Sequence, residues 1–367
     1  MKARKSLLTA ISVASALGMV AGPGVAQTSQ VTIYGILDIG PTYVSNQGGK
    51  SNWRMDAGTL QQSRIGFRGT EDLGGGYAAF FALENGFNLD DGSMATANVL
   101  FSRDSRVGLK GGFGSVSLGR QSNATVDAIA PYAASMLAYG PSYLSTHPGD
   151  HDRVLNIPTD NSVKYTTASL GGFTGIVTYG FGEQAGDNKQ NSTRNAGLSY
   201  VNGPLSLGAA YLWASGSNVT NAALLSTSSN PFGATGSGDV LRSVALGGSY
   251  QFERVFVHGN ATQSNFGLSN RTARTYEIGS RWNLSDALVL GADYSHTDVR
   301  AQAGLNIVSL SAAYYLSRRT NLYVVAANEN VSGTNAAGTP LTAQLFTMSA
   351  SSGSTQRVLH LGVRHTF

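Results

Sequence analysis

The sequence predicts an all-β fold: a transmembrane antiparallel β-barrel of sixteen strands with a long third loop. Three observations predict it. Short segments of alternating apolar and polar residues fill most of the chain, the connections between them alternate between short and long, and one such segment runs to the last residue, Phe367. A barrel spreads its membrane signal in this way, because lipid-facing and water-facing residues follow one another along every strand.

The last segment, 358–367, alternates with a period of two, as a strand does. One face carries Leu359, Leu361, Val363, His365 and Phe367. Termini of soluble domains usually fray, whereas the last strand of a membrane barrel must pair with the first, since lipid tolerates no open edge. We therefore expect this segment to close the barrel against residues 31–38. His365 and Phe367 should then lie in a girdle at the rim of the short turns.

The first 26 residues read as a secretory signal peptide. A basic start, Met1–Lys5, precedes the apolar stretch Ser6–Val20, and the small residues Gly24–Ala26 provide a cleavage site. An uncleaved membrane anchor is the alternative, but the apolar stretch is short for a spanning helix. Residues 27–367 then form a single barrel domain that is exported through a periplasm to an outer membrane.

Charge and cysteine content exclude several classes of protein. Lys2, Arg4 and Lys5 belong to the leader, so removing three of the 25 basic residues leaves 22 against 21 acidic ones. A chain with nearly balanced charge lacks the excess of basic residues that nucleic-acid-binding proteins usually carry. The chain has no cysteine, which excludes a disulfide scaffold.

The connections support the strand count. Glycine, asparagine or aspartate, which suit tight hairpins, marks most of the short turns. The short turns fall at Asp72–Gly76, Gly111–Gly114, Leu170–Gly172, Asn202–Pro204, Glu253–Arg254, Ser285–Asp286 and Ser317–Arg319. Longer polar stretches lie near 45–53, 88–104, 122–160, 182–192, 214–239, 264–273, 298–303 and 329–355. A soluble sandwich would explain single alternating segments, but not this pattern together with the leader.

A series of short motifs runs in order along the chain. They are Ser63–Gly76 (SRIGFRGTEDLGGG), Arg106–Lys110, Phe113–Gln121, Asn161–Tyr165, Tyr315–Thr320 and Gly362–Phe367. Together they resemble the general diffusion porins of Gram-negative bacteria, particularly the β-proteobacterial type. The resemblance implies a homotrimer in outer-membrane lipid and lipopolysaccharide, passive diffusion of small hydrophilic solutes and ions, and a third loop folded into the pore. It also implies that the barrel insertion machinery reads Phe367.

The stretch 122–160 is in the right place to be that constricting loop. A loop this long without an element of its own needs a functional reason, and a barrel of this size otherwise encloses a wide aqueous channel.

Strand parity predicts which charges face the lumen. Apolar neighbours alternate with the basic residues Arg64, Arg68, Arg106, Lys110 and Lys164. A charge facing lipid near the midplane costs about 2–4 kcal/mol, which favours the inward assignment. By resemblance, Arg64 and Arg106 match the basic wall of the constriction, and Arg153 joins them from the end of the loop.

Porins usually oppose this wall with acids on the third loop, but here residues 131–147 contain none. Only Asp127, Asp150 and Asp152 are available near the loop's ends. We therefore expect a channel that prefers anions or is weakly selective.

Arg120 shares its parity with outward-facing Val116 and Leu118. An arginine there is costly unless it is paired. The hypothesis is that it lies at the subunit interface and meets Asp90 or Asp91 of a neighbouring subunit.

An outer-membrane hydrolase would need a nucleophile beside a base or paired carboxylates, and the six histidines are scattered. His147 and His151 suggest a loop metal site, but Pro148 and Gly149 prevent a helical pair. We expect no enzyme activity, no cofactor and no metal. A substrate-specific outer-membrane channel is the closest alternative, and binding of other factors by the long loops is compatible with either.

Overall fold

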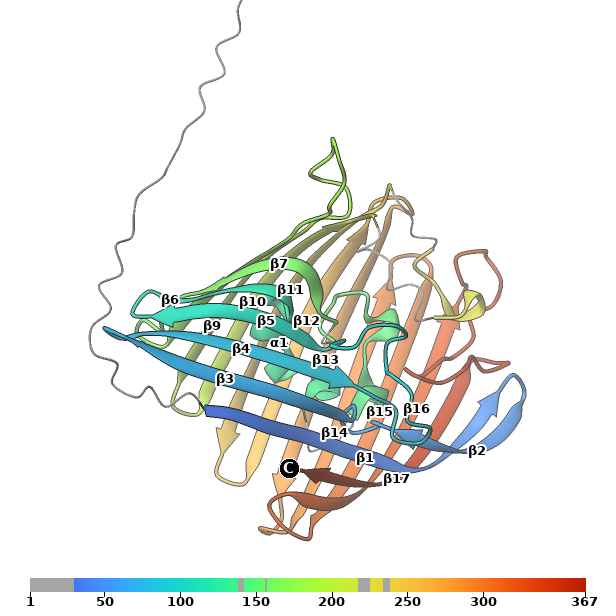
Figure 1. The fold of residues 1–367 in the computed structure, drawn as a ribbon. Coiled ribbons are helices and arrows are strands. Elements are labelled where there is room, and N and C mark those ends of the chain that lie inside the picture. The colour runs from blue at the N-terminus through green and yellow to red at the C-terminus, as the bar shows by residue number, and fades with distance from the viewer. Residues whose placement is uncertain (1–29, 138–141, 156, 217–224, 234–237) are drawn as a thin grey trace, which may run out of the picture.

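The computed structural model describes residues 30–137, 142–155, 157–216, 225–233 and 238–367. Their strands form one closed antiparallel sheet, so the predicted barrel is confirmed (Figure 1). The predicted leader, residues 1–26, lies outside the described residues. Among the described residues, no helix is both long and apolar enough to cross a membrane.

The elements follow one another with few helices. The strands are β1 (Gln30–Gln47), β2 (Lys50–Ala57), β3 (Arg64–Gly74), β4 (Tyr77–Gly86), β5 (Asp104–Gly111), β6 (Gly114–Gln121), β7 (Thr159–Thr166), β8 (Phe173–Gly180), β9 (Thr193–Asn202), β10 (Leu205–Ser215), β11 (Val240–Phe252), β12 (Val255–Phe266), β13 (Arg271–Asn283), β14 (Leu288–Val299), β15 (Ala303–Tyr315), β16 (Thr320–Gly333) and β17 (Thr355–Thr366). The third loop, residues 122–158, holds helix α1 (Ala124–Ile129) and the 3₁₀ turns Ala130–Tyr132, Ala134–Met136, Ser142–Ser145 and Pro148–Asp150; a further 3₁₀ turn is Thr227–Ser229.

The seventeen strand segments of the described chain occupy sixteen positions in the wall, as predicted. β3 pairs with the start of β1, from Gln30 to Ile36, and β2 pairs with its later part, from Ile39 to Gln47. The two segments are thus halves of one wall strand, interrupted at residues 58–63. Asp38 holds residues 58–63 against β1, because its carboxylate accepts a 2.8 Å hydrogen bond from the Gln61 amide.

Three of the expected long connections are short. Residues 45–53 belong to β1 and β2, which meet in a tight turn at Gly48 and Gly49, both with positive φ. The strands also extend into the polar stretches near 264–273 and 298–303. Polar composition did not distinguish loops from strands here, because a strand that extends beyond the apolar band can carry polar residues on both faces.

The barrel closes where β1 meets β17. Gly35 and Phe367 exchange two backbone hydrogen bonds, each 3.1 Å long. Gln30 pairs with Thr70 shortly before the turn 74–76, so this end of the seam lies at the rim of the short turns. The last strand therefore pairs with the first, as predicted, but the pairing runs along Ile36–Val44. The expected partner range, 31–38, overlaps it only at its end, because Gln30–Ile36 pair with β3.

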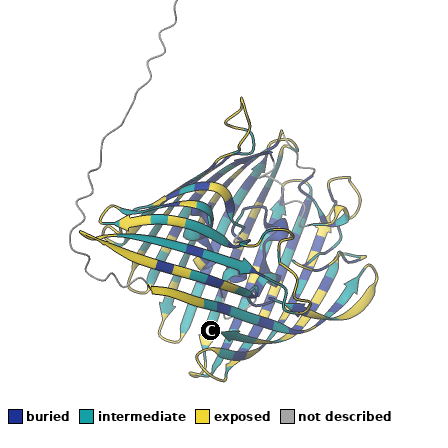
Figure 2. Cartoon of the chain, in the orientation of Figure 1, coloured by how far each residue is buried: buried dark blue, intermediate teal, exposed yellow. Residues whose placement is uncertain are grey.

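The two faces of the wall differ as alternation requires. Buried and exposed residues alternate along many strands (Figure 2). The outer face carries large apolar side chains such as Leu246, Ile278 and Leu310, which are 56–61% exposed, and the inner face carries buried polar residues such as Thr262 and Thr275. An apolar outer band of this kind is the surface that lipid covers.

Loops fill one side of the lumen. Phe232 from the β10–β11 connection and Leu341 from the β16–β17 connection pack with Leu212, Leu241 and Phe266 in one buried cluster. The third loop passes through the interior of the ring (Figure 1). A second buried cluster joins Leu144 of the third loop to Leu60, Val325 and Val358. Much of the packed core inside the barrel therefore lies against β10–β17.

Candidate pore constriction

The third loop enters the lumen through helix α1. Asn123 caps this helix: its side-chain oxygen accepts hydrogen bonds from the amides of Thr125 (3.0 Å) and Val126 (3.2 Å). Asparagine is a preferred residue at this position. The Asn195 side chain of β9 donates a 3.1 Å bond to the same oxygen, so the wall fixes the point where the loop starts.

Two glycines let the loop approach the wall. Gly208 of β10 and Gly247 of β11 are direct register partners. A Cβ at Gly208 would lie 2.0 Å from the Ala128 carbonyl oxygen, and one at Gly247 would lie 2.5 Å from the Tyr132 ring. Glycine in a strand often marks such a close backbone approach. The third loop therefore packs directly against the backbone of β10 and β11, where no side chain separates them.

His147 ties the middle of the loop to the wall. Its Nδ1 lies 2.6 Å from Asp152 and its Nε2 lies 3.0 Å from Glu277 of β13. Burial alone lowers the pKa of His147, but the two carboxylates outweigh burial and raise the pKa well above its usual value. The protonated ring donates from both nitrogens, and such charge-assisted bonds are the stronger kind.

The far side of the loop reaches across to β15 and to the interrupted wall strand. The Ser145 hydroxyl donates a 2.7 Å bond to Ser309, and the Tyr143 amide donates a 3.3 Å bond to the Thr59 carbonyl. The loop is thus held at both sides of the lumen, as a constriction requires.

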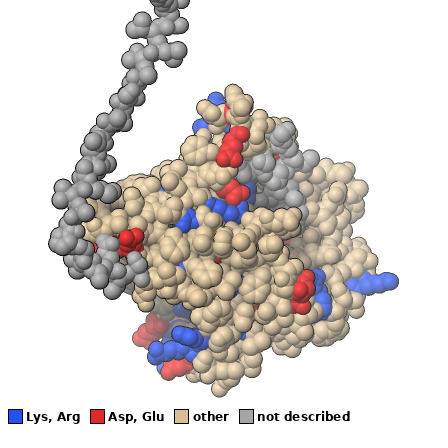
Figure 3. Space-filling view, viewed as in Figure 1, with Lys and Arg blue, Asp and Glu red and all other residues tan. Residues whose placement is uncertain are grey.

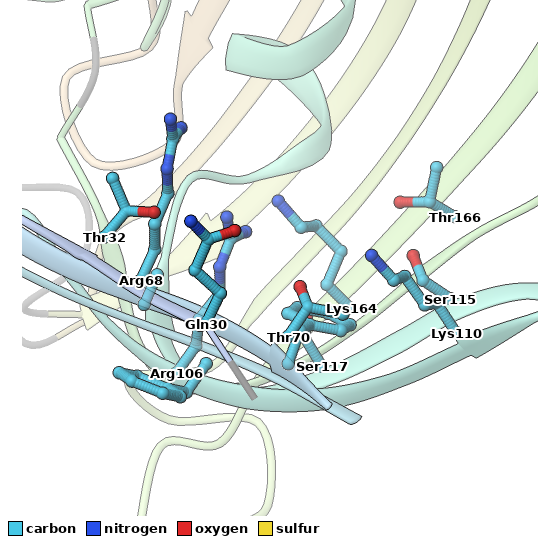
Figure 4. A pocket seen from close by; sticks show the side chains of 14 residues that line it. Gln30, Thr32, Arg68, Thr70, Arg106, Lys110, Ser115, Ser117, Lys164 and Thr166 are labelled. Atoms are coloured by element: carbon cyan, nitrogen blue, oxygen red, sulfur yellow. The ribbon is translucent and has the colours of Figure 1, made fainter. Parts of the chain in front are cut away.

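The open wall bears a cavity of about 600 Å³ lined by β1 and β3–β7. Arg68, Arg106, Lys110 and Lys164 point into it from the same side (Figure 4). None of the described residues that line it is acidic. Basic side chains also lie in a recess near the middle of the face in Figure 3, amid a largely uncharged surface.

Three arginines on or next to this wall have acidic partners. Glu84 accepts from Arg103 at 2.6 Å and lies 3.7 Å from Arg64. Arg106 lies 3.3 Å from Asp104 of its own strand. Parity assigned Arg64 and Arg106 to the lumen but missed Arg103, because this residue precedes β5 and lies outside the alternation.

Asp127 and Lys164 face each other across the base of the loop. Lys164 Nζ donates a 2.7 Å bond to Asp127 Oδ2 and also contacts Ser122 at 3.1 Å. The loop's first acid is therefore already paired with a wall cation, and it adds little negative field of its own.

Asp150 and Asp152 are not among the residues that line this cavity. They are 1% and 0% exposed, which corrects the expectation that they line the passage. Burial raises the pKa of Asp150 to about 8, whereas His147 overcomes burial and lowers the pKa of Asp152. Arg153 is half-buried beside Asp150. The backbone turns sharply after Pro148, with positive φ at Gly149, Asp150 and Arg153, and these residues lie between the third loop and the wall.

Arg120 has acceptors within its own chain. It pairs with Asp160 and donates a 2.8 Å bond to the Ser102 carbonyl. Asp91 is exposed and accepts from the Ser93 amide, and exposed Asp90 lines a small cavity with Arg54 and Tyr143. A neighbouring subunit is therefore not needed to satisfy Arg120, and the interface role stays a prediction.

His365 and Phe367 lie at the end of the closing strand. His365 Nδ1 is 2.9 Å from the Thr320 hydroxyl, and the Phe367 ring lies over Gly35, where a Cβ would be 2.4 Å from it. The aromatic ring therefore covers the glycine to which its own backbone is bonded.

A closed barrel with a loop anchored across its lumen defines a membrane channel. A profile of the Gram-negative porin family matches residues 12–334, and the chain belongs to that family. It is 30% identical to outer membrane porin protein 32 of Delftia acidovorans, over 96% of this chain and 98% of the relative. It is also 30% identical to an outer membrane porin protein of Bordetella pertussis, over 87% and 92%.

A solved structure agrees with this assignment. The anion-selective porin from Comamonas acidovorans superposes with a TM-score of 0.76 at 26% identity, covering 92% of this chain and all of that one. The predicted family and outer-membrane location are therefore confirmed, and the protein is a channel rather than an enzyme.

Proposed function

We propose that the channel allows passive diffusion of small hydrophilic solutes and ions past a constriction dominated by arginine and lysine, and that it prefers anions or is weakly selective. The observation that carries this proposal is the cavity whose charged lining residues, Arg68, Arg106, Lys110 and Lys164, are all cationic. Charges that line a pore set its ion preference.

The loop opposite this wall strengthens the proposal. Its acids are buried, like Asp150 and Asp152, or paired, like Asp127. A cleft lined by charges of one sign with low-dielectric walls concentrates the counter-ion. The anion selectivity of the Comamonas relative is in keeping with this chemistry.

Reversal potentials across a planar bilayer in a potassium chloride gradient test the proposal. We expect a sign that reports chloride preference, or a value near zero, and a shift toward cations in the double variant Arg68→Gln/Arg106→Gln. Arg274→Gln is the matched control, because Arg274 is exposed and bonds to Gln263 rather than lining the cavity. Clear cation preference of the unmodified channel would overturn the proposal.

A substrate-specific channel remains the alternative function. Such a channel would show flux that saturates with solute concentration, whereas simple diffusion rises in proportion. Liposome swelling with sugars and organic acids of similar size separates the two.

We further propose a homotrimer in outer-membrane lipid and lipopolysaccharide, with Arg120 near the interface facing Asp90 or Asp91 of a neighbour. Asp160, which pairs with Arg120 in the same chain, provides the control for a test of the interface role. If Arg120→Ala lowers the dissociation temperature of the trimer more than Asp160→Asn does, an intersubunit role is supported. Equal effects would reduce Arg120 to a structural role within one chain.

A further proposal concerns export of the chain and its assembly into the outer membrane. We infer that residues 1–26 are removed and that the barrel insertion machinery recognises the end of β17. N-terminal sequencing of protein taken from outer membranes should begin at Gln27; a blocked or longer start would contradict cleavage there.

A further inference from the structure

Three adjacent strands bring ligand-type side chains to one place behind the third loop. His258 of β12 pairs in register with Gly279 of β13, and Gly279 pairs with Asp293 of β14. Glu277 precedes Gly279 by two residues and shares its face. One potential ligand atom from each of His258, Glu277 and Asp293 lies within 4.8 Å of the others.

Gly279 leaves a space between two of these groups. A Cβ built on Gly279 would lie 2.5 Å from His258 Nε2 and 2.7 Å from Asp293 Oδ2. His258 Nε2 and Asp293 Oδ2 therefore both lie next to the position that a side chain at residue 279 would occupy. Any larger residue in the middle strand would occupy that point.

Asp293 gives an independent indication of a ligand. Its side chain is only 4% exposed, and within the described part of the chain neither carboxylate oxygen has a hydrogen-bond partner. Buried charges are normally paired or coordinated to a metal, because an isolated one is very costly.

His258 is oriented as a metal ligand usually is. Its Nδ1 donates a 2.9 Å bond to the Tyr132 carbonyl, so the neutral ring carries its lone pair on Nε2. Metal-binding histidines generally donate their other ring N–H to a carbonyl or carboxylate in this way. The carbonyl belongs to the third loop, which links the cluster to the constriction.

Glu277 is held in place by the same loop. One of its oxygens accepts from the Ala134 amide at 2.8 Å and from Asn260 at 3.0 Å, and the other lies 3.0 Å from His147. A carboxylate has lone pairs to spare for coordination beyond such bonds.

We propose that His258, Glu277 and Asp293 bind one divalent transition-metal cation, with Zn²⁺ as the best match. An imidazole nitrogen with carboxylate oxygens suits zinc, whereas calcium and magnesium prefer oxygen alone. The bound cation neutralises the buried carboxylates and, through Glu277 and His258, fixes the third loop at Tyr132 and Ala134. The sequence predicted no metal, because these residues meet only through strand register.

The experiment measures zinc binding to the full channel extracted from outer membranes. The protein is stripped with a chelator, dialysed against ZnCl₂, and its bound zinc is counted by mass spectrometry. We expect one zinc per chain, and at least tenfold weaker binding in His258→Gln and in Asp293→Asn. His296→Gln and Asp298→Asn are matched controls on β14, since neither residue belongs to the cluster.

Variants are compared only if they migrate as folded barrels on unheated gels. If neither cluster variant folds, X-ray absorption of the zinc-loaded unmodified protein decides the question. One imidazole and oxygen ligands support the site. A shell of water alone, several histidines, no bound zinc, or wild-type affinity in a folded cluster variant would overturn it.

Discussion

Lys164 Nζ donates a 2.7 Å hydrogen bond to Asp127 Oδ2, and this pair joins the cationic wall to the base of the third loop. The lysine side chain is 7% exposed and the aspartate 26%, so the pair is largely shielded from water. The negative charge of Asp127 offsets the positive charge of Lys164, which lines the cavity.

Removing either partner should change ion preference in opposite directions. Asp127→Asn leaves Lys164 uncompensated and should shift the reversal potential toward anions, whereas Lys164→Gln should shift it toward cations. Loss of a charged hydrogen bond should also cost about 1–3 kcal/mol locally. Asp298→Asn serves as the control for charge alone. Shifts of the same sign in the two variants would show that the pair lies away from the ion path.

Gly208 should tolerate no side chain. Gly208→Ala places a methyl group against the Ala128 carbonyl, 2.0 Å away, so we expect a loss of about 1–3 kcal/mol and an altered, noisier single-channel conductance as α1 is displaced. Gly248→Ala is the control, because its methyl group would meet the end of a flexible leucine at 2.9 Å. Identical unfolding temperatures and conductance in both variants would contradict the proposed seating of the loop.

His151 should make loop docking sensitive to acid. Burial lowers its pKa to about 4, with Asp152 opposing and His147 adding to the shift, and its Nε2 lies 2.7 Å from Thr275. Between pH 6.5 and about 4 the undocked histidine gains a proton that the docked one does not. This costs the docked state roughly 3 kcal/mol by the acid end. His151→Asn should therefore gain stability relative to wild type as pH falls through this range.

Asp150 should give a pH dependence of stability opposite in sign to that of His151. Its pKa is raised to about 8, so the docked aspartate holds a proton that the undocked one has lost between about pH 8 and 4. Asp150→Asn should lose stability relative to wild type as pH falls. Unfolding midpoints of both variants measured across pH 4–8 check the two signs. Parallel curves for the variants and wild type would contradict both assignments.

Deleting Phe367 should impair assembly without changing the pore. The deletion removes two backbone bonds to Gly35 and the ring that covers it. We expect fewer folded barrels on unheated gels, and unchanged conductance and selectivity for those that insert. Phe367→Tyr should retain assembly. Altered selectivity in the deletion variant would mean that the residue influences the lumen.

The alternating pattern was enough to predict the barrel. It also put Arg68, Arg106 and Lys110 on the same face of the wall, and all three line one cavity, because the period of a strand gives the face of each residue. It could not predict that Glu84 is shared by two arginines, because this depends on the pairing of β4 with its neighbours.

The loop was harder to predict for a different reason. Its composition indicated few acids, but Asp150 and Asp152 were expected in water and are instead buried between the third loop and the wall. Their direction depends on positive φ values after Pro148 and on partners such as Thr262, more than a hundred residues away in the chain. Neither local propensity nor periodicity contains that information.

The bonds between Gly35 and Phe367 also set an order for folding. They join the two ends of the described chain, so loop-closure entropy makes this contact among the most expensive to form. Hairpins between neighbouring strands can form early, because their partners are close in sequence. β1 must wait with an open edge until β17 has been synthesised and exported. Pairing of β1 with β17 is therefore the final step of folding. Until it forms, the open edge of β1 is the part of the chain most exposed to wrong partners.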